Sequence, residues 1–316
     1  MLYTKPHLNY ERQLALLASR GLIIDDRAKA ISTLRTVGYY RLSGYLYGFR
    51  RIAPELGRER RSDEFEPGTR LSWAVELCAF DDRLRVCFLA GLQRLEVILR
   101  TRTAYQLGKR DAFVHLDPVV LNRDLTLQLG GDDRYVAWRL RYDKLQADAR
   151  RERYVVHFNE KYDGSVPIWV AVEFMDLGCL TSLVGLAHTA DRRQLSREFR
   201  AGYASVLDKW LRLLNIARNT CAHNGRVWNR RWTFAPPKPP ALGDTAPVHH
   251  LSQMTDLSRT YVPLAICAHL LRSADPTDVW HTAITDLMVG IPAIPTLDVE
   301  GTMGFPQGWR SLELWS

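Results

Sequence analysis

The sequence predicts a mainly α fold in which β-structure is confined to short stretches. Three segments with strong 3.6-residue apolar periodicity carry this prediction, at residues 73–88, 89–105 and 205–219. The strand-like alternation of apolar and polar residues is scarce, and its best candidate is the short stretch 168–172. The chain is therefore expected to bury amphipathic helices against one another rather than against a large sheet.

The composition points to a globular protein with an anionic partner. The 316 residues are 46% apolar, which is enough for one large domain or two modest ones. Lys and Arg outnumber Asp and Glu by 43 to 35, so the formal net charge is +8. This balance favours nucleic acid first and a membrane surface second. Only seven of the basic residues are Lys. The planar guanidinium group of arginine suits phosphate, although a compositional bias of the source genome would produce the same excess of arginine over lysine.

The first 65 residues predict a helical block. One amphipathic helix covers residues 9–19, and Asp25 or Asp26 caps a second helix that continues to about residue 37. The tyrosine-rich run 38–49 follows, and it is interpreted as aromatic packing at a helical corner, with an RNA-binding platform as the alternative. A loop is then expected, because the charged segment is interrupted by proline and glycine up to residue 69.

Residues 134–154 predict a further helix that is rich in basic side chains, with seven basic residues against three acidic ones. Aromatic residues recur among them at helical spacing. Such a stripe is more often part of a core; in the alternative, the aromatic rings stack on RNA bases while arginines contact phosphates. The aromatic residues are Tyr135, Trp138 and Tyr142, and the candidate phosphate-binding residues are Arg150, Arg151 and Arg153.

Three segments are expected along the chain and are expected to pack as one body. They are the helical block 1–65, a main helical domain over 66–235, and the segment 236–316. The last segment begins with a stiff proline-rich linker, continues with a helix near 257–273 and ends in a tail rich in Gly, Pro and Trp. No cofactor is expected, because the common nucleotide-binding and hydrolase motifs are missing.

A cytoplasmic location is expected. No stretch reaches the roughly 18 apolar residues of a membrane span, and the first ten residues lack the apolar segment of a secretion signal. Five scattered cysteines without a CxxC spacing favour neither a disulfide framework nor a zinc site. The pair His249-His250 lacks metal-ligand spacing and is interpreted as part of a solvated loop.

The densest chemical cluster is the string RNTCAHNGRVWNR at residues 218–230. On the helix that begins near Ser205, Arg218 continues a buried stripe of leucines at i+4 and i+7 spacing. An arginine in that position needs a charged partner or a partner surface. His223 is five residues further on, so the two side chains converge only through a helix end near Gly225 or across two chains. The stripe consists of Leu207, Leu211 and Leu214.

Two interpretations of this cluster are open. In the simpler one, Arg218 makes a structural salt bridge and His223 makes a surface hydrogen bond. The additional polar residues in the same turn favour a functional site, because they concentrate hydrogen-bond donors beside a titratable base. They are Asn219, Asn224, Arg226 and Asn229. Glu96 is a candidate partner that would hold Arg218, and a solvent-exposed helix charge is the equally supported alternative.

The cluster resembles the signature of a known family. Arg218 and His223 match the R-x(4–6)-H motif of HEPN ribonucleases, and the longer string resembles that of Abi-like bacterial abortive-infection proteins of the AbiD/AbiF type. The segments RGLIIDDRAKAISTLRTVGYYRLSGYLYGFR, FDDRLRVCFLAGLQRLEVILRTR, PIWVAVEFMDLGCLTSLVGL and MGFPQGWRSLELW resemble further blocks of that family. One departure is Asn224, where the family frequently has a second histidine.

The resemblance implies a HEPN-like helical bundle, with an N-terminal helical block and a C-terminal helical extension, that cuts RNA without a metal. It implies that His223 removes the proton of the ribose 2′-OH, that Arg218 stabilises the charged phosphate, and that Asn219 orients the phosphate or the imidazole. The substrate-binding residues would include Asn224, Arg226 and Asn229. A homodimer with both motifs in one cleft, a structured non-coding RNA partner and a role in phage defence are implied as well.

Two other function classes fit the same residues. One is a non-catalytic RNA-binding or scaffold protein in which Arg218 and His223 only contact phosphates. The other is a structural interaction module of a defence complex. The fold does not decide among them, because function resides in the site.

Overall fold

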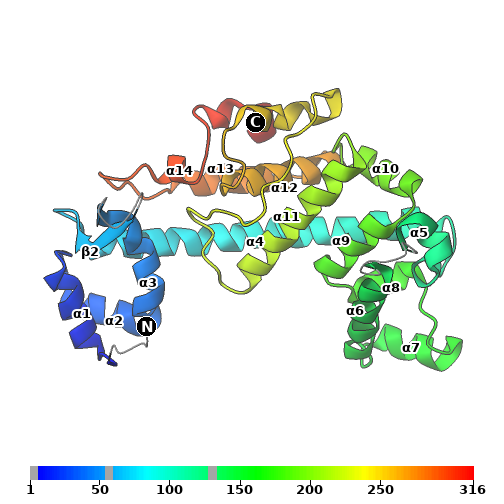
Figure 1. Ribbon diagram of the computed structural model, residues 1–316, viewed down its shortest axis with the longest axis horizontal. Coiled ribbons are helices and arrows are strands. Elements are labelled where there is room, and N and C mark those ends of the chain that lie inside the picture. The colour runs from blue at the N-terminus through cyan, green and yellow to red at the C-terminus, as the bar shows by residue number, and fades with distance from the viewer. Residues whose placement is uncertain (1–5, 54–59, 127–133) are drawn as a thin grey trace. The chain divides into compact units, whose positions relative to one another are not determined.

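The computed structural model describes residues 6–53, 60–126 and 134–316. Helices form most of this part of the chain, and its named strands are a single antiparallel pair (Figure 1). The prediction of a mainly α fold is confirmed. Contacts divide the chain into two compact units, residues 1–83 with 290–299, and residues 84–289 with 300–316. The three domain segments expected from the sequence stay predictions.

The first unit contains the predicted N-terminal helices. Asn9 caps α1 by accepting from the Arg12 amide at 2.9 Å, and Asp26, one of the two expected caps, accepts from the Lys29 amide at 3.0 Å to begin α2. Tyr45 is buried in α3, whereas Tyr40 is 91% exposed, so the interpretation of the tyrosine run as packing holds for only some of its members. The bounds are α1 Tyr10–Ser19, α2 Arg27–Thr36, α3 Tyr39–Leu46 and η1 Tyr47–Phe49.

A β-hairpin replaces part of the loop expected at residues 50–69, where the prediction was wrong. Strands β1 (Arg50–Ile52) and β2 (Arg61–Phe65) pair antiparallel, with Arg50 opposite Phe65. Cross-strand ion pairs join Arg50 to Asp63 at 3.1 Å and Arg51 to Glu64 at 2.9 Å. These charged strands show no apolar alternation, so no period-2 pattern marked them in the sequence; backbone pairing and the cross-strand ion pairs join them, and Phe65 is buried.

One continuous helix, α4 (Leu71–Gly108), replaces the two consecutive segments predicted at 73–88 and 89–105. Its residues up to Arg83 belong to the first unit and those from Leu84 to the second. The apolar positions Leu92, Leu95 and Leu99 are fully or almost fully buried, as the periodicity predicts.

The basic segment 134–154 forms two helices rather than the one predicted. Helix α6 ends at Asp148, and α7 begins at Arg153. The aromatic stripe is part of the core: Trp138 stacks on Tyr142 with ring centres 5.3 Å apart, and its indole donates to the carbonyl of Cys179 at 3.0 Å. The core interpretation of these aromatic residues is therefore confirmed. The second unit's first elements after α4 are η3 Val114–Leu116, α5 Pro118–Thr126, α6 Arg134–Asp148 and α7 Arg153–Tyr162.

Residues 168–172, the candidate strand, lie in helix α8 (Ile168–Phe174), so that prediction was wrong. Pro167 occupies the N-cap position, and Ile168, Ala171 and Val172 are buried at helical spacing. A short apolar run fits a strand or a buried helical turn equally well, and the packing against neighbouring helices decided this one.

The core of the second unit is built around α11 and α12. The Leu207, Leu211 and Leu214 stripe of α11 is buried as predicted, and α12 is buried from Tyr261 to Leu271. Such an apolar helix belongs at the centre of a packed unit. The remaining bounds are α9 Leu177–Leu186, α10 Thr189–Glu198, α11 Ala204–Ala222, η4 Gly243–Gln253, α12 Tyr261–Ala274, α13 Trp280–Val289, α14 Val299–Thr302, η5 Trp309–Ser311 and η6 Glu313–Trp315.

The contact between α4 and α13 depends on a glycine. The indole of Trp280 lies against Gly91 and donates to the carbonyl of Cys87 at 2.9 Å. A Cβ at residue 91 would lie 2.3 Å from Cε2 of Trp280, so the indole would have to move.

We expect Gly91→Ala to destabilise the protein by about 1–3 kcal/mol, because overpacking outweighs the better helix propensity of alanine. Gly185→Ala in α9 is the matched control, since nothing lies within 4 Å of its added Cβ. The free energy of unfolding of the control should rise by up to about 1 kcal/mol. Urea denaturation measures both changes, and a gain of stability in both variants would contradict the packing seen at Trp280.

Candidate active site

The candidate site begins at the end of α11, where the chain turns out of the helix. Helix α11 ends at Ala222 with His223 as its C-cap. Asn224 adopts a left-handed conformation with φ of 53°, its amide donates to the carbonyl of Cys221 at 3.1 Å, and the Gly225 amide donates to that of Thr220 at 2.8 Å. This pair of bonds is a Schellman motif, and asparagine is one of the few residues that accept its left-handed position. The helix end expected near Gly225 is therefore present.

Residue 225 must be glycine because atoms of Thr220 lie close to it, and not because of its φ angle. A Cβ at this position would lie 2.8 Å from Cγ2 and 3.0 Å from the carbonyl oxygen of Thr220. On the other side, the buried guanidinium of Arg85 in α4 donates from Nη1 to the carbonyl of Gly225 at 3.5 Å. The turn that follows His223 is thus held from two directions.

Arg218 meets a buried carboxylate of α4. Its Nε lies 3.4 Å from Oε2 of Glu96, and the Glu96 side chain is only 7% exposed. The other carboxylate oxygen, Oε1, accepts a hydrogen bond of 2.7 Å from Nη2 of Arg100, one helical turn further on. Glu96 therefore lies between two guanidinium groups, and the partner that the sequence named for Arg218 is in ion-pair contact with it.

The two arginines around Glu96 differ in how firmly they are held. Arg100 also donates to the carbonyl of Met175 at 2.9 Å and lies 3.8 Å from the carboxylate of Glu173. The side chain of Arg218 is 30% exposed and makes no hydrogen bond within the part of the chain that the structure describes. Arg100 is therefore a structural partner, whereas the Nη groups of Arg218 are available to a ligand.

His223 and Asn219 are exposed, and neither side chain makes a hydrogen bond among the described residues. No hydrogen bond or ion pair joins Arg218 to His223 within those residues. The structure thus places both residues on the last turn of α11 but shows no contact between them.

The remaining polar residues of the cluster divide into two groups. Asn224 forms the left-handed turn itself, and Arg226 follows it as a half-buried residue. Asn229 faces a different neighbour: its Oδ1 accepts from Nη1 of Arg259 at 3.3 Å, and Arg259 is bonded to Asp256 at 2.9 Å. Asn229 has a structural contact that the sequence did not indicate.

The three arginines proposed for the RNA path belong to a different part of the unit. Arg150 and Arg151 lie in the connection between α6 and α7, and Arg153 begins α7; all three are exposed. Arg150 donates to the carbonyl of Ala147 at 3.3 Å. None of them has a hydrogen bond or an ion pair with the Arg218 cluster within the described chain, so their role in RNA binding stays a prediction.

Sequence reasoning missed two residues of the site, Arg85 and Arg100. Arg100 was detectable, because an acidic and a basic residue at i and i+4 on a helix form a standard pair. Arg85 offered no such signal, since its acceptor is a backbone carbonyl 140 residues away.

A family comparison adds to this geometry. The model of a family described as Abi-like protein matches residues 32–229 of the chain. The chain belongs to the Abi-like family. The match covers α4, α8 and the whole of α11 with the turn after it, so every residue of the Arg218 cluster up to Asn229 is a family position. No curated protein and no solved structure matches the chain.

Within the described ranges, none of the helices has the length and apolar character of a membrane span, and no group of three or more His, Cys, Asp or Glu residues could hold a metal ion. The solvated loop expected around His249 and His250 is instead the 3₁₀ helix η4. Its buried Val248 and Leu251 draw it into the core, and His250 contacts the hydroxyl of Tyr261 at 2.7 Å.

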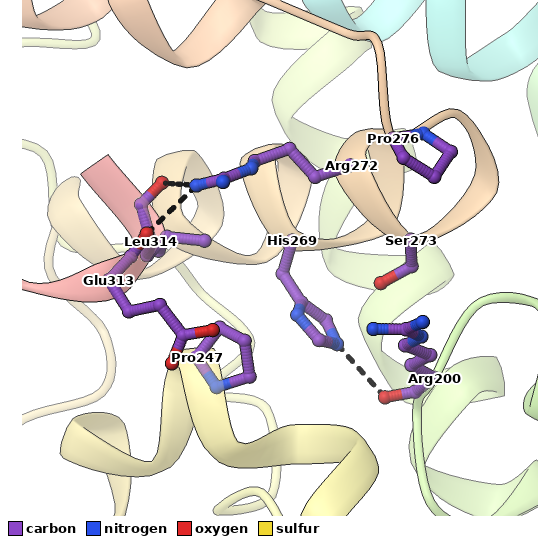
Figure 2. Close-up of a pocket in the computed structure, with 8 residues that line it drawn as sticks. All are labelled: Arg200, Pro247, His269, Arg272, Ser273, Pro276, Glu313 and Leu314. Atoms are coloured by element: carbon purple, nitrogen blue, oxygen red, sulfur yellow. Dashed lines mark hydrogen bonds between the residues drawn. The ribbon is translucent and has the colours of Figure 1, made fainter. Parts of the chain in front are cut away.

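A pocket of about 180 Å³ in this unit surrounds His269 of α12 (Figure 2). Nε2 of His269 donates to the carbonyl of Arg200 at 2.9 Å, and Nη1 of Arg272 donates to the carbonyls of Glu313 and Leu314, each at 2.8 Å (Figure 2). These bonds anchor the end of α10 and the C-terminal turn to α12. Burial lowers the pKa of His269 from 6.5 to about 4.

Because the pKa of His269 is lower in the folded chain than in the unfolded chain, the stability of the fold depends on pH. The unfolded chain takes up a proton near the ordinary pKa of about 6.5, before the folded chain does, so stability is complete above that pH and is lost as the pH falls towards 4. The contribution of His269 to this loss amounts to about 2 kcal/mol at pH 5.

We expect His269→Gln to reduce the drop in melting temperature between pH 7 and pH 5, because glutamine does not titrate there and its amide still donates to Arg200. His157→Gln, which changes an exposed histidine of α7, is the control and should leave the drop as it is. An undiminished drop in the His269 variant would show that this histidine does not carry the acid sensitivity.

Proposed function

We propose that this protein is a metal-independent endoribonuclease of abortive-infection type that cuts RNA at Arg218 and His223. The observation that carries the proposal is the position of Arg218: Glu96 holds its Nε from a buried site, while its Nη groups make no hydrogen bond among the described residues and the exposed His223 caps the same helix. Membership of the Abi-like family supports the abortive-infection context and hence a role in phage defence.

The chemistry follows from these two side chains. The imidazole of His223 takes the proton of a ribose 2′-OH, and the oxygen attacks the adjacent phosphorus. The bond to the 5′ oxygen of the next nucleotide breaks, that oxygen takes up a proton, and a 2′,3′-cyclic phosphate remains. Negative charge grows on the pentacoordinate phosphate, where the Nη groups of Arg218 stabilise it.

Neighbouring residues position these groups. Glu96 acts as a positioning residue, because its ion pair limits the orientations of the Arg218 guanidinium. Asn219 is one residue beyond Arg218 and exposed, so its amide can contact the phosphate or the imidazole. Asn224 and Arg226 lie in the turn that follows and offer polar contacts to the RNA on either side of the cut.

A non-catalytic RNA-binding protein is the second candidate. The observation in its favour is that no hydrogen bond orients the imidazole of His223 within the described residues, whereas a general base is usually oriented by a further group. In that case Arg218 and His223 serve as phosphate contacts, and a structured RNA is the partner rather than the substrate.

We expect His223→Ala and Arg218→Ala each to lower RNA cleavage by a factor of about 10² to 10⁴ while the fold persists. Cleavage of end-labelled RNA in the presence of EDTA measures the loss, and the products should carry cyclic phosphate ends. Circular dichroism checks the fold of each variant.

His157→Ala, at an exposed histidine outside the cluster, is the control and should cut normally. Unchanged cleavage in the His223 variant would contradict the assignment of the base. A loss of cleavage with EDTA that magnesium restores would contradict the metal-independent mechanism.

A homodimer belongs to the proposal. The leucine stripe of α11 is buried within this chain and Arg218 has Glu96 as its partner, so neither requires a partner chain. What supports the dimer is that no contact joins Arg218 to His223 among the described residues, because a second copy of the motif would bring its own Arg218 to this His223.

We expect light scattering to give twice the chain mass of 36.3 kDa. A mixture of His223→Ala and Arg218→Ala chains should regain about a quarter of the normal cleavage, since half of the dimers are mixed and each contains one intact composite site. No recovery in mixed dimers, or full cleavage by a monomer, would show that each chain forms its own site.

A further inference from the structure

A second pocket lies between α4 and α8, further along α4 than the candidate site. It has a volume of about 530 Å³, which is within the range of small-molecule sites. Its walls include Ala104, Tyr105, Gly108 and Lys109 of α4, and Trp169 and Glu173 of α8. We refer to it as the Trp169 pocket.

Two large aromatic side chains of this pocket are exposed. Trp169 is 53% exposed and Tyr105 is 67% exposed, and no other tryptophan of the chain is among the exposed apolar residues. Trp169 lies over Gly108, because a Cβ there would be only 3.4 Å from its ring. Lys109 lies 4.4 Å from the centre of the Tyr105 ring, so a positive charge borders the aromatic surface.

Arg100 links the Trp169 pocket to the Arg218 site. It binds Glu96 on one side and lies 3.8 Å from Glu173, a wall of the pocket, on the other. Ala104 and Gly108 of the pocket follow one and two helical turns after Arg100, each step of four residues turning about 40° around α4. The distance along the helix axis from Glu96 to Ala104 is about 12 Å.

We propose that the Trp169 pocket binds a nucleobase of the RNA whose phosphate is held by Arg218. The inference rests on the proposed function and adds a base-binding subsite to it. The base stacks on Trp169 and Tyr105, as exposed aromatic side chains do in single-strand binding, while Lys109 contacts the backbone phosphate.

Glu173 gives this subsite a base preference. Its carboxylate is 57% exposed and is an acceptor only, with two oxygens. Guanine offers it two donors on one edge, the ring N–H and the exocyclic amino group, and so matches a bidentate contact. Uracil offers one donor flanked by two carbonyl oxygens, which the carboxylate repels. The subsite is therefore selective for guanine.

The test uses labelled single-stranded RNA octamers, one of uridines only and one with a single guanosine in the middle. The protein carries His223→Ala so that the RNA is not cut, and fluorescence anisotropy gives the dissociation constants. We expect tighter binding of the guanosine octamer, a loss of about tenfold with Trp169→Ala, and a smaller loss with Trp169→Phe, which retains a stacking face.

Two further variants separate the roles. Glu173→Gln should reduce the preference for the guanosine octamer, because the neutral amide loses the bidentate contact with guanine and no longer repels the carbonyl oxygens of uracil. Tyr203→Ala removes a tyrosine that is 55% exposed at the start of α11 and should change neither constant. An equal loss with Tyr203→Ala, or unchanged binding with Trp169→Ala, would overturn the subsite.

Parallel measurements separate this inference from the proposed function. Trp169→Ala alone, with His223 intact, should lose the preference for cutting near guanosine. If it cuts RNA at the same positions and rates as the unaltered protein, the subsite fails while the nuclease stands. If the unaltered protein binds the octamers with the expected preference but cuts no RNA, the nuclease fails while base binding stands.

If Trp169→Ala converts a dimer into a monomer without changing RNA affinity, the pocket holds a second copy of the chain, which also overturns the subsite.

Discussion

The buried carboxylate of Glu96 is the interaction on which the candidate site depends. An unpaired charge in a protein interior is costly, and removing one member of a buried pair typically costs about 3–5 kcal/mol. Glu96 avoids this cost by lying between Arg100 and Arg218. Arg100 also donates to the carbonyl of Met175 and lies near Glu173, whereas the partly exposed Arg218 makes no hydrogen bond among the described residues. The same contact that stabilises the interior thus directs an arginine outward, where it can meet a phosphate.

Helix α4 positions both sides of this arrangement. Its Arg85 contacts the turn after His223 through the carbonyl of Gly225, and its Glu96 contacts Arg218 three turns further along. The end of α11 is therefore fixed at two points by a single helix. Sites built on regular elements are held more precisely than sites on loops, and the bent segment here is short because the Schellman motif satisfies its backbone amides.

The errors of prediction share one physical cause. The hairpin of β1 and β2 was missed because its strands are held by Arg–Asp and Arg–Glu pairs, which leave no hydrophobic pattern in the sequence. Helix α8 was taken for a strand because a run of five apolar residues fits both structures until its neighbours are known. The 3₁₀ helix η4 was taken for a solvated loop because its buried Val248 and Leu251 are isolated in a polar segment. In each case contacts distant in sequence outweighed the local pattern.

The sequence by itself determined the local features of this protein: the helical periodicity, a cap at Asp25 or Asp26, the helix end near Gly225, and the need of Arg218 for a charged partner or a partner surface. Each depends on residues a few positions apart, whose geometry follows from one helical turn. Tertiary structure alone decided which carboxylate forms the ion pair with Arg218, since Glu96 is 122 positions away. It also decided that the leucine stripe of α11 is buried within the chain. It likewise left Trp169 exposed, whereas Trp73 is half-buried and the other tryptophans are buried. Burial depends on which surfaces meet when the helices pack, and periodicity identifies the face of a helix but not its neighbour.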